Sequence, residues 1–289
     1  MKQRSQSAIG IAFVGLLPAI IGGPVWAIAI TVLGLIGFHE FLAIAGRLSH
    51  DIKPVGYAIL PLFALATFID RADVAILGAV ALAFMLPLAE ATLRADLRGS
   101  VTDWALGTAG TIYLGLPIYA AIELRSIPGP VDATWLSDLA ETLSFGWDAN
   151  PRGLAWLTGI ILMTWMADSF AYIVGRQFGK HKFSPVVSPN KTLEGLAGGI
   201  AGAAVTGAIV FIVFGIDDRW WIGLALGAIL AIVGLFGDLA ESVLKRQAGV
   251  KDSSSLIPGH GGMLDRLDAL LFTFVAGLYL VILVDHYVL

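Results

Sequence analysis

Charged side chains interrupt apolar segments in the second half of the sequence, and they are the residues best suited to chemistry. Asp168, Asp238 and Glu241 each stand within a stretch that is otherwise apolar. A charged group inside an apolar membrane segment costs roughly 2.5–3.5 kcal/mol on insertion scales. For a single acid of this kind, a buried hydrogen bond or a helix contact is as good an explanation as a functional role. The spacing of the acids relative to other polar residues distinguishes the two.

Three sets of polar residues follow helical spacing, which places each set on one face of a predicted helix. The sets are Asp168, Tyr172 and Arg176; Asp238, Ser242 and Lys245; and Asp265 with Asp268. We expect the acids at 238, 265 and 268 to lie at one depth. Carboxylates together with substrate phosphates are the ligands that Mg²⁺ prefers. The sequence therefore predicts a magnesium site, and leaves open whether a monovalent cation such as K⁺ shares it.

The loop between the last two sets has the composition of a phosphate-binding segment. It contains Lys245 and Arg246, then Lys251 followed by Asp252 and three serines, then Pro258–Gly262. Small residues let the backbone approach a polyphosphate, and Lys and Arg supply countercharge. A glycine-rich loop alone is weak evidence, but its position directly before Asp265–Asp268 makes the pattern specific.

Residues 242–268, SVLKRQAGVKDSSSLIPGHGGMLDRLD, resemble the signature of the phosphatidate cytidylyltransferase family. The shared pattern is S-x-apolar-K-R, K-D, a Ser/Gly segment, P-x-H-G-G and D-R-x-D. A second block, residues 168–199, is also similar to the family, with A-Y-x-x-G-R at 171–176 and S-P-N-K-T-L-E-G at 188–195. The blocks cover about a third of the chain, and the first 150 residues match only in being apolar.

The resemblance implies an enzyme that joins CTP and phosphatidic acid to give CDP-diacylglycerol and pyrophosphate in phospholipid biosynthesis. It implies metal binding by Asp238, Asp265 and Asp268. The residues it implies for catalysis are Lys245, Arg246, Lys251, Asp252, His260 and Arg266. The residues it implies for substrate binding are Asp168, Tyr172, Arg176, Ser188, Lys191, Ser242, Gly261 and Gly262. The expected partners are CTP, phosphatidic acid and membrane lipids, with no nucleic acid; a homodimer is left open.

A secondary transporter is the alternative from another class, because intramembrane carboxylates and glycine-broken helices also occur in transporters. Transport gives no reason for polar residues to gather in two loops at one face. The positions of the polar residues therefore favour the enzyme.

The elements that must position these residues are membrane helices. Of the residues, 57% are hydrophobic and 14% are charged, against roughly 25% charged in a soluble domain. We predict an all-α polytopic membrane protein, since helices satisfy every backbone group in hydrocarbon. The chain lacks cysteine, which excludes disulfides and thiolate chemistry. About nine spans are expected, over 7–23, 25–46, 55–70, 73–93, 103–125, 153–175, 192–215, 219–244 and 265–284.

Basic residues predict the orientation of these spans. With a cytoplasmic N-terminus, fourteen Lys and Arg side chains lie inside, and only Arg71, Arg125, Arg152 and Arg219 lie outside. The positive-inside rule favours this arrangement. It places the C-terminus in the periplasm, the protein in the inner (plasma) membrane and the active site toward the cytoplasm. Residues 1–150 are expected to be N-terminal transmembrane helices and residues 151–289 the catalytic region, within one membrane-integrated unit without a soluble domain.

Three local predictions concern positions beside the motifs. Ser188 is expected to cap the seventh helix at its N-terminus, with Pro189 as the first helical residue. The glycine pairs 195/199 and 198/202 are expected to be close-packing surfaces. For His39 and Glu40, packing or interfacial anchoring is favoured over binding of a lipid headgroup.

Overall fold

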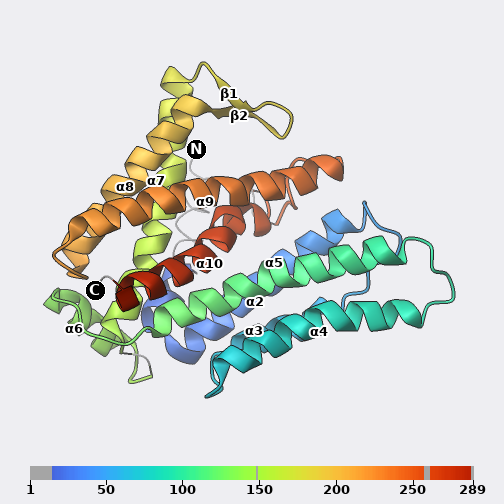
Figure 1. The fold of residues 1–289 in the computed structure, drawn as a ribbon, viewed down its shortest axis with the longest axis horizontal. Coiled ribbons are helices and arrows are strands. Elements are labelled where there is room, and N and C mark those ends of the chain that lie inside the picture. Colours follow the sequence, from blue (N-terminus) through green and yellow to red (C-terminus); the bar gives the residue numbers. More distant parts are fainter. Residues whose placement is uncertain (1–14, 148, 257–260, 288–289) are drawn as a thin grey trace. The chain divides into compact units, whose positions relative to one another are not determined.

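The computed structural model describes residues 15–147, 149–256 and 261–287 (Figure 1). Of the first predicted span, 7–23, residues 15–21 are helical and residues 1–14 lie outside the described part of the chain. The remaining helices are α2 (Gly23–Ala45), α3 (Gly56–Ala66), α4 (Ala72–Thr92), α5 (Ser100–Ser126), α6 (Thr134–Leu143), α7 (Pro151–Phe178), α8 (Leu193–Phe214), α9 (Trp220–Gln247) and α10 (Leu264–Tyr287). Two short strands, β1 (Lys182–Ser184) and β2 (Ser188–Thr192), form an antiparallel hairpin.

Seven helices in the described residues are long and apolar enough to cross a bilayer: α2, α4, α5, α7, α8, α9 and α10. This confirms an all-α polytopic membrane protein. The span predicted over 55–70 is matched only by α3, which has 11 residues. At 1.5 Å per residue this helix is about 16 Å long, well short of a hydrocarbon core of roughly 30 Å. Helix α6, within the predicted outer loop, was not expected.

The chain forms two compact units, and neither is a continuous segment. Among the described residues, the first unit consists mainly of Ala27–Ile122 and Val243–Leu267. The second consists of Leu16–Trp26, Glu123–Ser242 and residues 268–287. The two blocks that resemble the cytidylyltransferase signature therefore belong mostly to different units, and each is described within its own.

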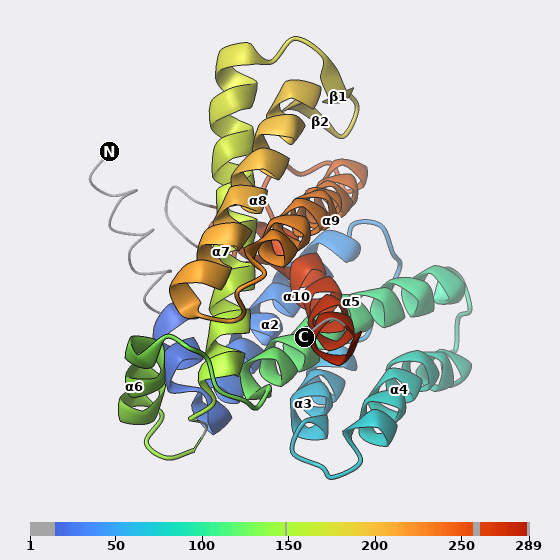
Figure 2. The same cartoon turned by 60° about the vertical axis from the view of Figure 1, so that its left-hand side comes forward.

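Helices α3, α4 and α5 of the first unit pack through one apolar cluster (Figures 1 and 2). Ile59 and Phe63 of α3 are buried against Ala79 and Ala83 of α4, and side chains of α5 cover the same cluster. Close contact with α5 is possible because Gly115 has no side chain: a Cβ atom there would lie 2.6 Å from the Phe63 ring. Helix α2 packs on α3 through the Phe38 ring, whose centroid lies 5.2 Å from that of Tyr57.

A charged cluster fixes the loops at one end of the first unit. Asp103 of α5 accepts hydrogen bonds from the backbone N–H groups of His50 and Asp51, at 2.9 and 3.0 Å, and from the Arg94 guanidinium at 2.5 Å. Glu90 binds the same guanidinium, and these two carboxylates raise the pKa of Arg94. Arg94 therefore ties the loop after α2 to α4 and α5.

Helices α7, α8 and α9 of the second unit approach one another through glycine (Figure 2). A Cβ atom on Gly195 or Gly199 of α8 would lie 2.8 Å from a carbonyl oxygen of α7, and one on Gly198 or Gly202 would lie 2.5 Å from an α7 side chain. Helix α9 contacts the α8 backbone in the same manner at Gly223. The predicted role of the glycine pairs on α8 as packing surfaces is confirmed.

Candidate functional site

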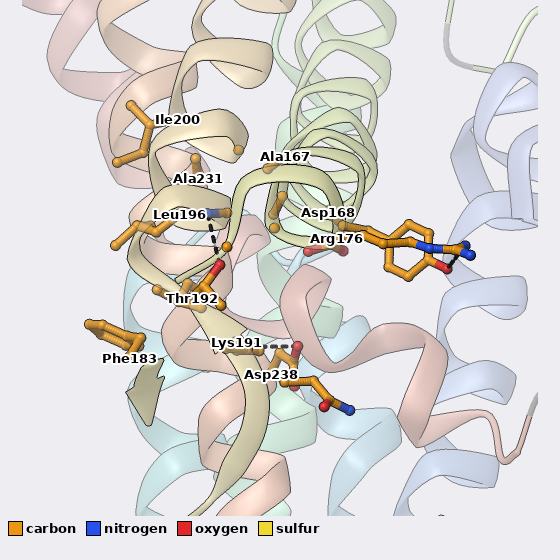
Figure 3. Close-up of a pocket in the computed structure, with 18 of the residues that line it drawn as sticks. Ala167, Asp168, Arg176, Phe183, Lys191, Thr192, Leu196, Ile200, Ala231 and Asp238 are labelled. Atoms are coloured by element: carbon orange, nitrogen blue, oxygen red, sulfur yellow. Dashed lines mark hydrogen bonds and ion pairs between the residues drawn. The ribbon is translucent and has the colours of Figure 1, made fainter. Parts of the chain in front are cut away.

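A pocket in the second unit lies between α7, the β-hairpin, α8 and α9 (Figure 3); we call it the hairpin pocket. Its volume is about 540 Å³. Five of the predicted site residues line it: Asp168, Tyr172, Arg176, Lys191 and Asp238. The i, i+4, i+8 set on α7 therefore faces one cavity, as the spacing predicted.

An ion pair crosses the hairpin pocket from β2 to α9. The Lys191 ammonium lies 2.6 Å from the Asp238 carboxylate, and the two side chains are 20% and 32% exposed. Ser242, one turn further along α9, donates a hydrogen bond to Asp238 at 3.3 Å. Partial burial strengthens the attraction between opposite charges. The Nζ atom of Lys191 is itself buried, so the exposed part of that side chain is its stem.

Arg176 takes a different direction. Its guanidinium donates to the Tyr172 hydroxyl at 3.1 Å, both side chains are exposed, and Figure 3 shows Arg176 extending away from Lys191 and Asp238. The pocket thus has basic side chains from two separate elements, the hairpin and α7.

The β-hairpin is held by residues at the start of α8. The Glu194 carboxylate accepts hydrogen bonds from the backbone N–H groups of Lys180 and His181 and lies 2.6 Å from the His181 ring. Thr192 accepts a hydrogen bond from the Gly195 N–H at 3.1 Å and is the N-cap of α8. These contacts fix the strand that carries Lys191.

The predicted N-cap at Ser188 is wrong. Ser188 and Pro189 lie in β2, where Ser188 pairs with Ser184, and α8 begins at Leu193. Serine at 188 and threonine at 192 are both residues that can cap a helix. Pairing with β1 keeps residues 188–192 extended, so Thr192 is the N-cap.

Sequence reasoning missed further residues of the hairpin pocket. Lys182 and Phe183 of β1 and Asn190 of β2 line it. Asn190 and Thr192 could have been found, because both stand inside the S-P-N-K-T-L-E-G motif. Nothing in the residue pattern indicated that a strand would bring Lys182 to the same cavity.

The glycine-rich loop belongs to the first unit, where its described residues surround Asp265. The Lys245 ammonium lies 2.5 Å from Asp265, and the side chains are only 10% and 7% exposed. Asp265 also accepts hydrogen bonds from the backbone N–H groups of Ser253 and Gly262, at 2.9 and 2.8 Å. A predicted phosphate-binding lysine and a predicted metal ligand therefore form one buried ion pair.

The other predicted residues of this loop are less enclosed. Lys251, Asp252, Arg246 and Arg266 are exposed, and the Arg246 guanidinium donates to the Val250 carbonyl at 3.1 Å. Gly261 has φ +79, a left-handed conformation that favours glycine. His260, predicted for catalysis, lies outside the described residues.

The predicted magnesium ligands are divided between the units: Asp265 belongs to the first, and Asp238 and Asp268 belong to the second. Over the described ranges, no three Asp, Glu, His or Cys side chains come together as a metal-binding group. In the second unit, however, a Cβ atom on Gly237 would lie 2.5 Å from the Asp268 carbonyl oxygen, so α9 and α10 meet beside both Asp238 and Asp268. The contact brings the backbones beside these two acids together, and carboxylate oxygens are the kind of ligand that a hard cation prefers.

Fold and site together define an integral membrane protein of apolar helices that carries partly buried Lys–Asp pairs at two polar positions. The chain belongs to the cytidylyltransferase family, whose sequence profile matches residues 2–284.

Curated relatives agree with this assignment. The phosphatidate cytidylyltransferases of Bacillus subtilis and Staphylococcus saprophyticus are each 32% identical over 282 residues. These matches cover 94% of this chain and 94% and 95% of the two relatives. The enzyme of Staphylococcus haemolyticus is 44% identical over 120 residues, which is 42% of this chain and 46% of the relative.

Proposed function

We propose that this protein is a phosphatidate cytidylyltransferase, which transfers CMP from CTP to phosphatidic acid and releases pyrophosphate. The match to enzymes of that name over 94% of the chain is the observation that carries the proposal. The alternative of a secondary transporter is not favoured, because these full-length relatives are named as enzymes.

The chemistry requires charge neutralisation more than acid–base catalysis. A phosphate oxygen of the lipid attacks the α-phosphorus of CTP, the bond from that phosphorus to the bridging oxygen breaks, and pyrophosphate leaves with the electron pair. The lipid phosphate is already an anion, so no strong base is needed. Phosphoryl transfer of this kind depends on positioning and on stabilising the charge of the leaving group.

We assign this neutralisation to the partly buried ammonium groups. Lys191 in the hairpin pocket and Lys245 beside the glycine-rich loop are each held near a carboxylate. Arg246, Lys251, His260 and Arg266 are proposed for the triphosphate, with Asp252 in the same loop. Asp168, Tyr172, Arg176, Ser188, Ser242, Gly261 and Gly262 are proposed to bind substrate.

We further propose that Asp238, Asp265 and Asp268 bind Mg²⁺, as the sequence spacing predicts. When bound, the metal would neutralise phosphate charge and orient the triphosphate. Asp238 and Asp268 are supported by the close approach of α9 and α10 beside them.

The substrate class can be tested directly. Purified protein with CTP and magnesium should release pyrophosphate with phosphatidate and not with diacylglycerol, because the proposed nucleophile is the lipid phosphate. Pyrophosphate and CDP would be measured separately. Formation of CDP from diacylglycerol would identify a lipid kinase, and the absence of turnover in varied detergents and lipids would restore the transporter.

We also propose nine spans, counting the short α3 with its flanking residues 55–70 as one of them, a cytoplasmic N-terminus and an active site facing the cytoplasm from the inner membrane. The distribution of fourteen Lys and Arg side chains inside and four outside supports this orientation. Each of the four outer residues is engaged within its own unit. Arg71 pairs with Asp73, Arg152 with Asp285 and Arg219 with Asp217. The buried Arg125 guanidinium donates to the carbonyls of residues 19, 20 and 150.

Single cysteines can test this topology, since the chain has none of its own. Ser184→Cys in β1 and Ser254→Cys in the glycine-rich loop should react with a membrane-impermeant thiol reagent only from the cytoplasmic side. Ala133→Cys, next to α6, should react from outside. Reaction of Ser254→Cys in sealed cells would refute the cytoplasmic placement.

A further inference from the structure

Glu40 is a buried carboxylate of the first unit that sequence reasoning assigned to packing or anchoring. It lies on α2 and is 3% exposed. Its two oxygens accept four hydrogen bonds: from the hydroxyls of Ser253 and Ser254, at 2.9 and 2.6 Å, and from the backbone N–H groups of Met263 and Leu264, at 3.0 and 2.7 Å. All four donors belong to the glycine-rich loop or the start of α10, more than 200 residues away along the chain.

The position of Glu40 suits the start of α10 electrostatically. The first N–H groups of a helix have no acceptor within the helix, and the helix dipole places partial positive charge there. Leu264 is the first residue of α10, and Glu40 of α2 provides a charged acceptor for its N–H. Hydrogen bonds to an ionised acceptor are about twice as strong as neutral ones.

Glu40 and Asp265 meet at Ser253. The Ser253 hydroxyl lies 2.9 Å from an oxygen of each carboxylate, and its single proton can serve only one of them at a time. Asp265 also binds the Lys245 ammonium. Glu40 is thus one hydroxyl away from the Lys245–Asp265 pair.

The loop packs so closely against α2 at Gly262 that no side chain fits there. A Cβ atom there would overlap the Ser253 hydroxyl and the Glu40 carboxylate. The second glycine of the P-x-H-G-G motif is therefore required by a residue of α2, which lies outside both motif blocks.

We propose that Glu40 is a positioning residue for cytidylyl transfer: it holds the described ends of the glycine-rich loop on α2, so that Lys245 and Asp265 are presented in a fixed arrangement. The inference rests on the proposed function, which it deepens. With both oxygens occupied by the loop, Glu40 acts through the loop and does not itself hold a lipid headgroup.

Glu40→Gln tests this role while preserving shape. A glutamine amide has one acceptor oxygen and would face N–H and O–H donors with its NH₂ group, so at most part of the network survives. We expect kcat to fall at least about tenfold. Glu90→Gln is the matched control, because Glu90 is a partly buried carboxylate of the same unit that binds Arg94 and does not touch the loop; it should stay within about threefold of the parent.

A second measurement follows the loop without using activity. Lys251 is exposed within the loop, so limited trypsin digestion in detergent can report loop release. In Glu40→Gln, cleavage after Lys251 should accelerate at least about threefold, while cleavage after the exposed Arg98 should not change. A general loss of stability would accelerate both.

The outcomes separate this inference from the proposed function. Unchanged kcat and unchanged cleavage after Lys251 in Glu40→Gln would overturn the positioning role, and so would an equal loss of kcat in Glu90→Gln. If the parent does not turn over CTP and phosphatidate, the proposed function fails. The cleavage comparison alone then decides whether Glu40 holds the loop. If Glu40→Gln does not fold, Ser254→Ala removes one of the four hydrogen bonds and should show the same loop-specific change in smaller measure.

Discussion

Asparagine in place of Asp238, Asp265 or Asp268 is expected to lower kcat at least about a hundredfold, which corresponds to roughly 2.7 kcal/mol. Asparagine keeps the shape and removes the charge. A carboxylate that binds magnesium would lose both its affinity for the metal and its contribution to neutralising phosphate charge. A merely structural carboxylate would keep much of its activity.

The structure adds a complication that the experiment must resolve. Asp238 pairs with Lys191 and Asp265 with Lys245, so Asn at either position leaves a partly buried ammonium without its partner. Loss of such a pair lowers stability. Thermal unfolding in detergent should therefore be measured beside kcat over a magnesium titration, because added metal can rescue a weakened metal site but cannot restore an ion pair.

Asp70→Asn is the matched control, since Asp70 is exposed and lies outside both motif blocks. Its kcat should stay within about threefold of the parent. Should the three variants remain folded and turn over within that same range, the assignment of a metal site to these acids would be wrong.

The second large effect is expected at Lys191. Lys191→Met keeps the aliphatic stem and removes the ammonium from the hairpin pocket. A hydrogen bond to a charged group contributes about 1.5–3 kcal/mol, so kcat/KM should fall about tenfold to a hundredfold.

Lys180→Met gives the control for Lys191, because it removes one positive charge from the same connection between α7 and α8. Lys180 is exposed and does not line the hairpin pocket. Its kcat/KM should change less than about threefold. Equal losses in the two variants would show that net charge near the membrane surface matters, and not a site at Lys191.

Sequence patterns predicted the charged residues that α7 contributes to the hairpin pocket, because their positions are set by local geometry. Asp168, Tyr172 and Arg176 follow helical periodicity, and any helix over those residues must bring them to one face. The packing role of the glycine pairs on α8 was also predicted, since closely packed membrane helices require small residues. The division of the chain at residue 150 stays a prediction.

The strand that carries Lys191 was not predicted, because local signals at Ser188 and Thr192 are nearly equivalent. Serine and threonine both cap helices, and pairing with β1 decided between them. The position of Lys182 in the hairpin pocket was not predicted for the same reason. Strand register depends on how two segments pair, so neither segment predicts it alone.

By itself, the sequence determined that this protein is an all-α polytopic membrane protein of the cytidylyltransferase type, because composition, helical spacing and motif residues are properties of short stretches of chain. Only the tertiary structure decided which partners the charged groups take. Glu40 stands beside His39 in an otherwise apolar stretch and matches no motif. It nevertheless accepts four hydrogen bonds from the glycine-rich loop and the start of α10. Such a contact joins residues more than 200 positions apart, and it arises because a buried carboxylate must find donors wherever the packing brings them.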